Sequence, residues 1–400
     1  MRQVPIIRIP FSEEDVQTIQ DDIGQVLNSG MLTLGAYTRR FEKQFKEFTG
    51  AEHVLAVSNG TSALEVIIRG LGIEGKSIIV PTNTFLASAL AVAHAGNRVI
   101  FADSDPETFS LNPADVERRI EADTAAVMVV HIGGIISPDM DTIIDLCSKK
   151  GLFLIEDCAH AHGSTIRGTH AGLLGDAGAF SFFPTKTLTT GEGGMVITNN
   201  AALYEKASML RNQGKNPTMG GKISEFGHNW RISELTAALG VQQMKRAPTI
   251  LADRGRIAAF YNDALQEIQG VRAVRPPAGT TTSHYKYIVY LDPEFDRAQV
   301  KQVMKDTYGV SLTGEVYADL CHQEPVWENY TYCGKQRSGQ PDCTKWPECG
   351  CGDVTQEFPG ADYVSKHHIC LPMYPGLEEE DLQHVIDSLD RTLQVDLRQA

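Results

Sequence analysis

A lysine stands in a part of the sequence where a solvated surface charge is not expected. Lys186 lies in the run SFFPTKTLTTGEGG (residues 181–194), between two apolar stretches that are typical of buried strands. A lysine amine forms an imine with an aldehyde and, once released, can move a proton between two carbon atoms. The glycines that follow let the backbone approach a ligand closely. The pattern therefore predicts a nucleophilic lysine in a binding site.

An acidic pair ends an apolar run ahead of this lysine. Glu156 and Asp157 close the run LFLIED, and ligands of open α/β sheets bind at the carboxyl ends of strands. From there, Asp157 could pair with a protonated pyridine nitrogen, which keeps such a ring an electron sink for a carbanion at an amino acid α-carbon. The alternative is that Asp157 only caps a helix.

A third group is the turn SNGTS (residues 58–62), where a strand is expected to end and a helix to begin. Helix N-termini present unpaired N–H groups and a positive dipole, so Gly60, Thr61 and Ser62 could wrap a phosphate. Alternatively, Ser58 or Thr61 only caps the helix. The three features together are more specific than any one of them, because the turn, the acid at the strand end and the lysine occur in the order that one cofactor requires.

The elements that would position these groups alternate between short apolar strands and helices from about residue 30 to residue 200. Near-continuous apolar strands separated by helices indicate a mainly parallel sheet that is covered on both faces. The predicted core is therefore of the α/β class. The expected strands are HVLAVS, SIIVP, RVIFADSD, AAVMVVHIG, LFLIEDCA, GAFSFF and GGMVITNN.

The second part of the chain indicates a smaller domain. After Ser233 a long helical stretch is expected to run until Pro276 and Pro277 interrupt it. We place the domain change along this stretch. The prediction is a large domain over residues 1–250 and a smaller C-terminal α+β domain over residues 251–400.

A loop insertion is predicted at residues 332–353, which are rich in Gly, Pro and Cys. Four thiolates in one loop could bind structural zinc, although the spacing lacks two C-x2-C knuckles. Free or adventitiously oxidised thiols are a second interpretation, and native disulfides are a third that a reducing compartment disfavours. The four side chains are Cys333, Cys343, Cys349 and Cys351.

The overall charge excludes some classes of partner. With 36 basic and 50 acidic side chains the formal net charge is -14, which repels polyphosphate backbones, so nucleic acid is not an expected partner. The first residues, MRQVPIIRIP, do not resemble a signal peptide, and no apolar stretch reaches the ~20 residues of a membrane span. We therefore expect a cytoplasmic protein without a membrane partner.

The segments SNGTSAL, EDCAHAHG, FSFFPTKTLTTGEGGM and GHNWRISELTAALG together resemble the DegT/DnrJ/EryC1/StrS family of sugar aminotransferases. The likeness runs from about Ser29 to the terminal helix. It implies the type I fold of pyridoxal-phosphate (PLP) enzymes, that of aspartate aminotransferase. The cofactor would cycle between PLP and its pyridoxamine form, PMP.

The resemblance also implies roles for single residues. Lys186 matches the Schiff-base lysine and Asp157 the partner of the pyridine nitrogen. His160 occupies a position that is often glutamine and faces the ring hydroxyl. The phosphate would be held by the SNGTS turn and the first residue of the lysine motif, and an aromatic ring would stack on the cofactor. These residues are Gly60, Thr61, Ser62, Ser181 and, for stacking, Phe85.

Two further implications concern the substrate and the subunits. Asn229 is similar to a residue that reaches the phosphate from a neighbouring subunit, which implies a homodimer with shared sites. Arg231 could bind the carboxylate of the amino donor, since a guanidinium fork suits that geometry, or could form a structural ion pair. His322 could line the sugar pocket. Phe183 departs from the polar residue or histidine that relatives often have, which could reshape that pocket.

The predicted reaction is transfer of an amino group from L-glutamate to a keto sugar, most simply a nucleotide-linked 4-keto-6-deoxyhexose. Related dehydratases have histidine at the lysine position, so Lys186 counts against that branch. One alternative is amination of a free keto sugar or cyclitol. The other is a non-catalytic regulatory relative, for which an absent cofactor colour would be the evidence.

Overall fold

Parallel strands form most of the central sheet, as the apolar runs predict. The sheet has seven strands in the order β1-β9-β8-β5-β4-β2-β3. The contiguous pairs from β8 through β5, β4 and β2 to β3 are parallel, whereas β9 is antiparallel to both β1 and β8. The predicted α/β class with a mainly parallel sheet is confirmed.

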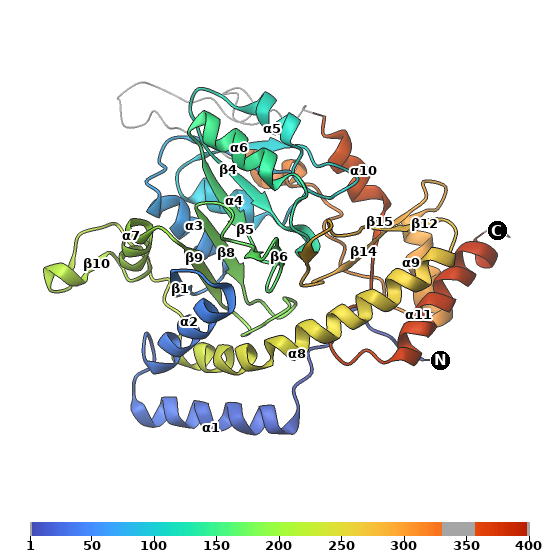
Figure 1. Ribbon diagram of the computed structural model, residues 1–400, viewed down its shortest axis with the longest axis horizontal. Coiled ribbons are helices and arrows are strands. Elements are labelled where there is room, and N and C mark those ends of the chain that lie inside the picture. The colour runs from blue at the N-terminus through green and yellow to red at the C-terminus, as the bar shows by residue number, and fades with distance from the viewer. Residues whose placement is uncertain (1, 330–356, 398–400) are drawn as a thin grey trace.

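The computed structural model describes residues 2–329 and 357–397 (Figure 1). The predicted Cys-rich insertion, with Cys333, Cys343, Cys349 and Cys351, lies outside the described residues. The strands are β1 (His53–Val57), β2 (Ser77–Pro81), β3 (Arg98–Ala102), β4 (Thr124–Val130), β5 (Phe153–Asp157), β6 (Thr165–Ile166), β7 (Thr169–His170), β8 (Ala177–Ser181), β9 (Gly194–Thr198), β10 (Lys215–Asn216), β11 (Lys222–Ile223), β12 (Val271–Ala273), β13 (Thr280–Thr281), β14 (Tyr287–Leu291) and β15 (His368–Leu371). The α-helices are α1 (Glu13–Ser29), α2 (Ala36–Thr49), α3 (Gly60–Gly70), α4 (Ala87–His94), α5 (Pro113–Arg119), α6 (Met140–Lys150), α7 (Ala201–Arg211), α8 (Glu234–Ala264), α9 (Arg297–Tyr308), α10 (Pro359–His367) and α11 (Glu379–Arg391).

Side chains alternate between the two faces of the sheet, and helices cover both faces. In β2, Ile79 packs into one core, whereas Ile78 and Val80 pack into the other. Helices α2 and α6 and the first half of α8 cover the first core, and helices α3, α4 and α7 cover the second. Because both faces are buried, most strand positions are apolar, and polar residues stand mainly at the strand ends, which explains the near-continuous apolar runs in the sequence.

Helix α8 connects the large sheet to the smaller C-terminal part of the chain (Figure 1). Its residues up to Ile250 pack against the sheet, and its residues from Ile257 pack into a separate core with β14, β15, α9 and α11. Strands β12, β14 and β15 form an antiparallel sheet there. The domain boundary after residue 250 would fall inside this continuous helix, so the division into 1–250 and 251–400 stays a prediction.

The expected end of this long helical stretch was wrong. The helix ends at Ala264, and β12 follows before the two prolines at 276 and 277. Gly270 has φ +87, a left-handed conformation that suits glycine and turns the chain back. Short β12 is held as a strand by pairing with β14, a long-range contact that local helical patterning does not reveal.

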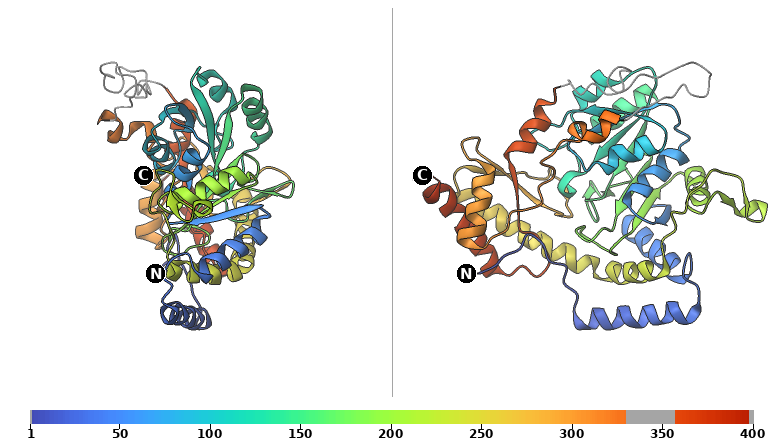
Figure 2. Two further views of the ribbon diagram at one scale, coloured as in Figure 1. Left: turned by 90° about the vertical axis from the view of Figure 1, so that its left-hand side faces the viewer. Right: turned by 180° about the vertical axis from the view of Figure 1, so that it is seen from behind.

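Two elements project from this body (Figures 1 and 2). Helix α1 lies outermost, alongside α8, and the segment with β10 and β11 extends away from α7. Among the described residues, none of the helices combines the length and apolarity needed to cross a membrane.

A close approach between α2 and α8 generates a stability prediction. A Cβ atom on Gly240 would lie 2.7 Å from Cδ1 of Phe41, and the Phe41 ring contacts that of Phe182 at 5.0 Å between centroids. Gly240→Leu should therefore lower the free energy of unfolding by about 1–3 kcal/mol through overpacking. Thermal unfolding at one fixed protein concentration measures the change.

The matched control is Gly255→Leu in the same helix, where an added Cβ meets no atom within 4 Å. That change should stabilise the protein by roughly 0.5–1 kcal/mol through helix propensity alone. Equal effects of the two substitutions would contradict the packing explanation.

Candidate active site

A cavity of about 440 Å³ lies at the carboxyl edge of the parallel strands. Val130, Asp157 and Ser181, the last residues of β4, β5 and β8, line it together. Tyr285, just ahead of β14, and Tyr317 close it from the smaller part of the chain. Seven predicted catalytic or cofactor-binding residues line this cavity: Gly60, Thr61, Phe85, Asp157, His160, Ser181 and Lys186.

The Asp157 side chain is held in place by its hydrogen bonds. The side chain is only 6% exposed. One carboxylate oxygen accepts a hydrogen bond from the Ser88 hydroxyl at 2.8 Å, and the other accepts from the Ala159 backbone N–H at 3.0 Å. Thr84 lies 2.9 Å from the Ser88 oxygen and can orient that hydroxyl. A fixed carboxylate at the cavity wall is suited to a protonated ring nitrogen.

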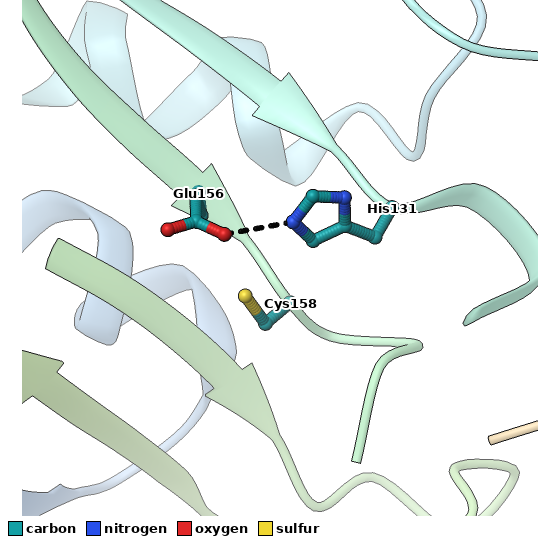
Figure 3. A group of neighbouring side chains, drawn as sticks. All are labelled: His131, Glu156 and Cys158. Atoms are coloured by element: carbon teal, nitrogen blue, oxygen red, sulfur yellow. Dashed lines mark hydrogen bonds and ion pairs between the residues drawn. The ribbon is translucent and has the colours of Figure 1, made fainter. Parts of the chain in front are cut away.

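Glu156, the neighbour of Asp157, does not line the cavity. One oxygen lies 2.9 Å from Nε2 of His131 and close to Cys158 (Figure 3). Three backbone N–H groups, of Gly172, Leu174 and Gly175, donate to this carboxylate at 2.7–2.8 Å. The three side chains offer metal-ligand atoms, but the glutamate oxygens already accept four hydrogen bonds or ion-pair contacts. We therefore assign this group to the packing of the sheet edge.

Lys186 lies half-buried, with its Nζ atom 4.9 Å from the centroid of the Tyr285 ring. Within the described part of the chain it forms no ion pair with a carboxylate. Burial lowers the pKa of Lys186 to about 8, Asp157 acts in the opposite direction, and Lys286 lowers the pKa further. A substantial fraction of the amine is therefore uncharged, and nucleophilic, close to neutral pH.

His160 forms one wall of the cavity with two tyrosines. Its ring stacks on Tyr285 at 4.1 Å between centroids with an interplanar angle of 21°. Burial holds the pKa of His160 well below its usual range, so the ring is neutral. Its Nδ1 accepts from the Gly133 N–H at 3.3 Å, which leaves the ring hydrogen on Nε2, 3.0 Å from the Tyr317 hydroxyl.

The predicted phosphate turn is the N-terminus of α3. Asn59 is the N-cap and accepts from the Ser62 N–H at 2.8 Å, while the Ser62 hydroxyl oxygen accepts from the Asn59 N–H at 3.1 Å. The Ser62 hydroxyl thus completes the cap and does not line the cavity, whereas Thr61 does. A Cβ on Gly60 would lie 2.8 Å from Cβ of Ser181, so only glycine lets these two segments meet.

Besides Ser62, three predicted site residues among the described ones lie outside the cavity of the single chain. Asn229 is exposed beyond α7. Arg231 donates to the side-chain oxygen of Asn212 at 3.0 Å. His322 is buried, with Nδ1 2.6 Å from the Thr82 hydroxyl. Their predicted roles stay predictions.

Phe85 and Phe183 both line the cavity with large exposed fractions, 61% and 44%. The Phe85 ring lies 6.0 Å from that of Tyr317. Because so much of the Phe85 ring is exposed in the cavity wall, a flat ligand could stack on its face. Phe183 supplies apolar surface where relatives often have a polar residue or histidine.

Sequence reasoning did not identify Tyr285, Tyr317 or Ser88. Tyr285 is the first residue of the run YKYIVYL, which predicts a strand, and that position was its only local signal. Tyr317 and Ser88 lie in segments without a motif, and they reach the site through long-range contacts with His160 and Asp157.

The residues present fit pyridoxal phosphate. Lys186 offers an amine with lowered pKa, Asp157 offers a fixed anion, and Phe85 offers an uncovered ring face. The α3 N-terminus with Thr61 and Ser181 offers donors for a phosphate. Fold and site together define a type I pyridoxal-phosphate-dependent enzyme.

Comparison with known proteins identifies the family. The sequence profile of the DegT/DnrJ/EryC1/StrS aminotransferase family matches residues 13–346. GDP-perosamine synthase of Vibrio cholerae is 38% identical over 372 residues, covering 92% of this chain and 94% of that protein. A dTDP-4-dehydro-2,3,6-trideoxy-D-glucose 4-aminotransferase of Saccharopolyspora spinosa is 32% identical over 393 residues, covering 94% of each.

Solved structures agree with this assignment. Bacillus subtilis NtdA with bound PMP has a TM-score of 0.81 at 25% identity, covering 96% of this chain and 84% of that chain. The protein belongs to the DegT/DnrJ/EryC1/StrS aminotransferase family. The predicted cofactor and the transaminase class are thereby confirmed, whereas the roles of individual site residues stay predictions.

The lowered pKa of Lys186 predicts how cofactor capture depends on pH. Only the uncharged amine attacks an aldehyde, so the rate at which cofactor-free protein binds pyridoxal phosphate covalently should rise with pH through about 8 and level off above it. Stopped-flow absorbance over a pH series measures this rate. A midpoint near the ordinary lysine value of 10.5 would show that the amine is not desolvated.

Proposed function

We propose that this aminotransferase moves the amino group of L-glutamate to a nucleotide-linked 4-keto-6-deoxyhexose. The main support for this chemistry is that Lys186, whose pKa burial lowers, and the fixed carboxylate of Asp157 line the same cavity. The names of two relatives support the substrate, since one makes GDP-perosamine and the other aminates carbon 4 of a dTDP-linked sugar.

Each role in the proposed reaction belongs to a residue of the cavity. Pyridoxal phosphate, when bound, supplies an electron-withdrawing ring that stabilises negative charge at the donor's α-carbon. Asp157 keeps the ring nitrogen protonated, because Ser88 and the Ala159 N–H hold its carboxylate in place. Lys186 would hold the cofactor through its amine, and the uncharged amine would accept the α-proton of the donor. His160 and the two tyrosines cover one side of the cavity against water.

The sugar would enter over the exposed aromatic wall. Phe85 and Phe183 present apolar faces to the cavity, and a deoxyhexose has an apolar methyl group where an ordinary hexose has a hydroxyl. Such a surface favours the deoxy sugar because a buried hydroxyl without a partner costs free energy. The apolar wall thus favours a class of sugar and does not discriminate between nucleotides.

We propose that the active unit is a homodimer with shared sites. The segment between α7 and α8 exposes Phe226, Ile223 and Met219 by 99%, 69% and 51%, and it extends from the body (Figure 1). Exposed apolar side chains gathered on one projection are typical of an interface. Asn229 and Arg231 directly follow this segment, so a partner's cavity is where they would act.

The proposed activity is tested with labelled glutamate and a panel of keto sugars. Transfer of label to a GDP- or dTDP-linked 4-keto-6-deoxyhexose is expected. Lys186→Ala should lower the rate at least ~10³-fold, because nucleophile and proton carrier are lost together. Lys150→Ala, which removes an exposed lysine at the end of α6, should leave the rate within about twofold.

Two outcomes would contradict this assignment. Near-parental transamination by Lys186→Ala would exclude that lysine as the cofactor-bearing amine. Preference for a free keto sugar or cyclitol over every nucleotide-linked sugar would favour the alternative substrate class, and a colourless protein after incubation with pyridoxal phosphate would favour a regulatory relative.

Mixing two inactive variants tests the shared sites. Lys186→Ala and Asn229→Ala should each be inactive or strongly impaired as homodimers. In a mixed dimer, one site carries both substitutions and the other carries neither. Activity should therefore reappear on subunit exchange, at up to roughly a quarter of the parental level for random mixing. No recovery, with exchange verified by mass spectrometry, would place Asn229 outside the partner's site.

A further inference from the structure

A second lysine approaches the aromatic ring that Lys186 approaches. The Lys186 Nζ atom lies 4.9 Å from the centroid of the Tyr285 ring, and the Lys286 Nζ atom lies 5.5 Å from the same centroid. The backbone of this segment is tied to the large sheet, since the Lys286 N–H donates to the Gly133 carbonyl at 3.4 Å. Two lysine side chains from distant parts of the chain thus lie against the same tyrosine ring.

Lys286 has no carboxylate partner among the described residues, although the side chain is half-buried. Burial lowers the pKa of Lys286, and the carboxylate of Glu315 opposes this lowering. Glu315 already pairs with Lys301. Lys286 does not line the cavity, so it is not placed to contact a substrate. An unpaired cation held away from water raises the free energy of any further positive charge nearby.

The other charges around the pair come from several elements. Asp157 is the one carboxylate with a direct effect on Lys186 and opposes the effect of Lys286. Arg254 of α8 donates to the His284 carbonyl at 2.8 Å and so is fixed in place. The groups facing Lys186 or Lys286 are Asp157, His160, His162, Glu192, Arg254, Tyr285, Glu315, Tyr317 and Cys370.

We propose that Lys286 is a positioning residue for Lys186: its fixed positive charge at the shared Tyr285 ring repels a second charge and so favours the uncharged, nucleophilic amine. A lysine activated by burial next to another cation is a known route to a reactive amine. The direction of the pKa of Lys186, lowered by burial and by Lys286, agrees with this geometry. The inference rests on the proposed role of Lys186.

The test compares two variants of the full-length, cofactor-free protein. Lys286→Met removes the charge and keeps much of the length of the side chain, whereas Lys286→Arg keeps the charge. The two amines lie 4.9 Å and 5.5 Å from one ring centroid, so at an effective dielectric constant near 20, removing one charge should raise the midpoint of covalent pyridoxal phosphate capture by roughly one pH unit. At pH 7 the capture rate should fall by about 3- to 10-fold in Lys286→Met.

Lys286→Arg should keep the parental midpoint within about 0.2 pH units, because its charge is retained. An unchanged midpoint in Lys286→Met would overturn the proposal, and so would an equal shift in both variants. Lys286→Gln, which is also uncharged, is measured in parallel in case the methionine variant does not fold. Failure of the parent itself to capture the cofactor would instead overturn the role of Lys186, which distinguishes the two proposals.

Discussion

The site depends on how β5 ends. Because successive side chains of a strand point to opposite faces, its last two carboxylates are separated: Glu156 faces the packed loop at residues 172–175, and Asp157 faces the cavity. Glu156 accepts three backbone N–H hydrogen bonds there, which anchor the chain beyond the strand. Asp157 can then present its buried carboxylate to the cavity, at the edge where β4 and β8 also end.

Charge is distributed unevenly between surface and site. The chain has a formal net charge of -14, yet Lys186, Lys286 and Arg254 lie around one cavity, and Asp157 is the carboxylate that acts directly on Lys186. A phosphorylated cofactor, a dicarboxylate donor and a nucleotide-linked sugar are all anions. Positive charge on these side chains would attract such ligands.

The smaller part of the chain contributes to the chemistry as well as to stability. Tyr285 and Tyr317 reach across to His160, and Lys286 sits behind Tyr285. Helix α8 connects the core of the large sheet to the core of the smaller part, because its two halves pack into these different cores. A change in the angle between these cores would therefore alter the cavity wall. The family match identifies the class of enzyme, whereas these contacts describe how this chain builds its cavity.

The sequence by itself determined the α/β class, the order of the strands along the chain, and the conjunction of turn, acid and lysine that indicates pyridoxal phosphate. Those properties are local: apolar runs, a cap and a glycine-rich motif are readable within a few residues. Only the tertiary structure decided which predicted residues share one cavity. It placed Ser62 in the helix cap and His322 beside Thr82, and it brought in Tyr285, Tyr317, Ser88 and Lys286. The end of α8 was misjudged for the same reason, since β12 is a strand only because β14 pairs with it. The contacts of Ser88 with Asp157 and of Tyr317 with His160 span 69 and 157 positions, so they depend on packing, and no local pattern records them.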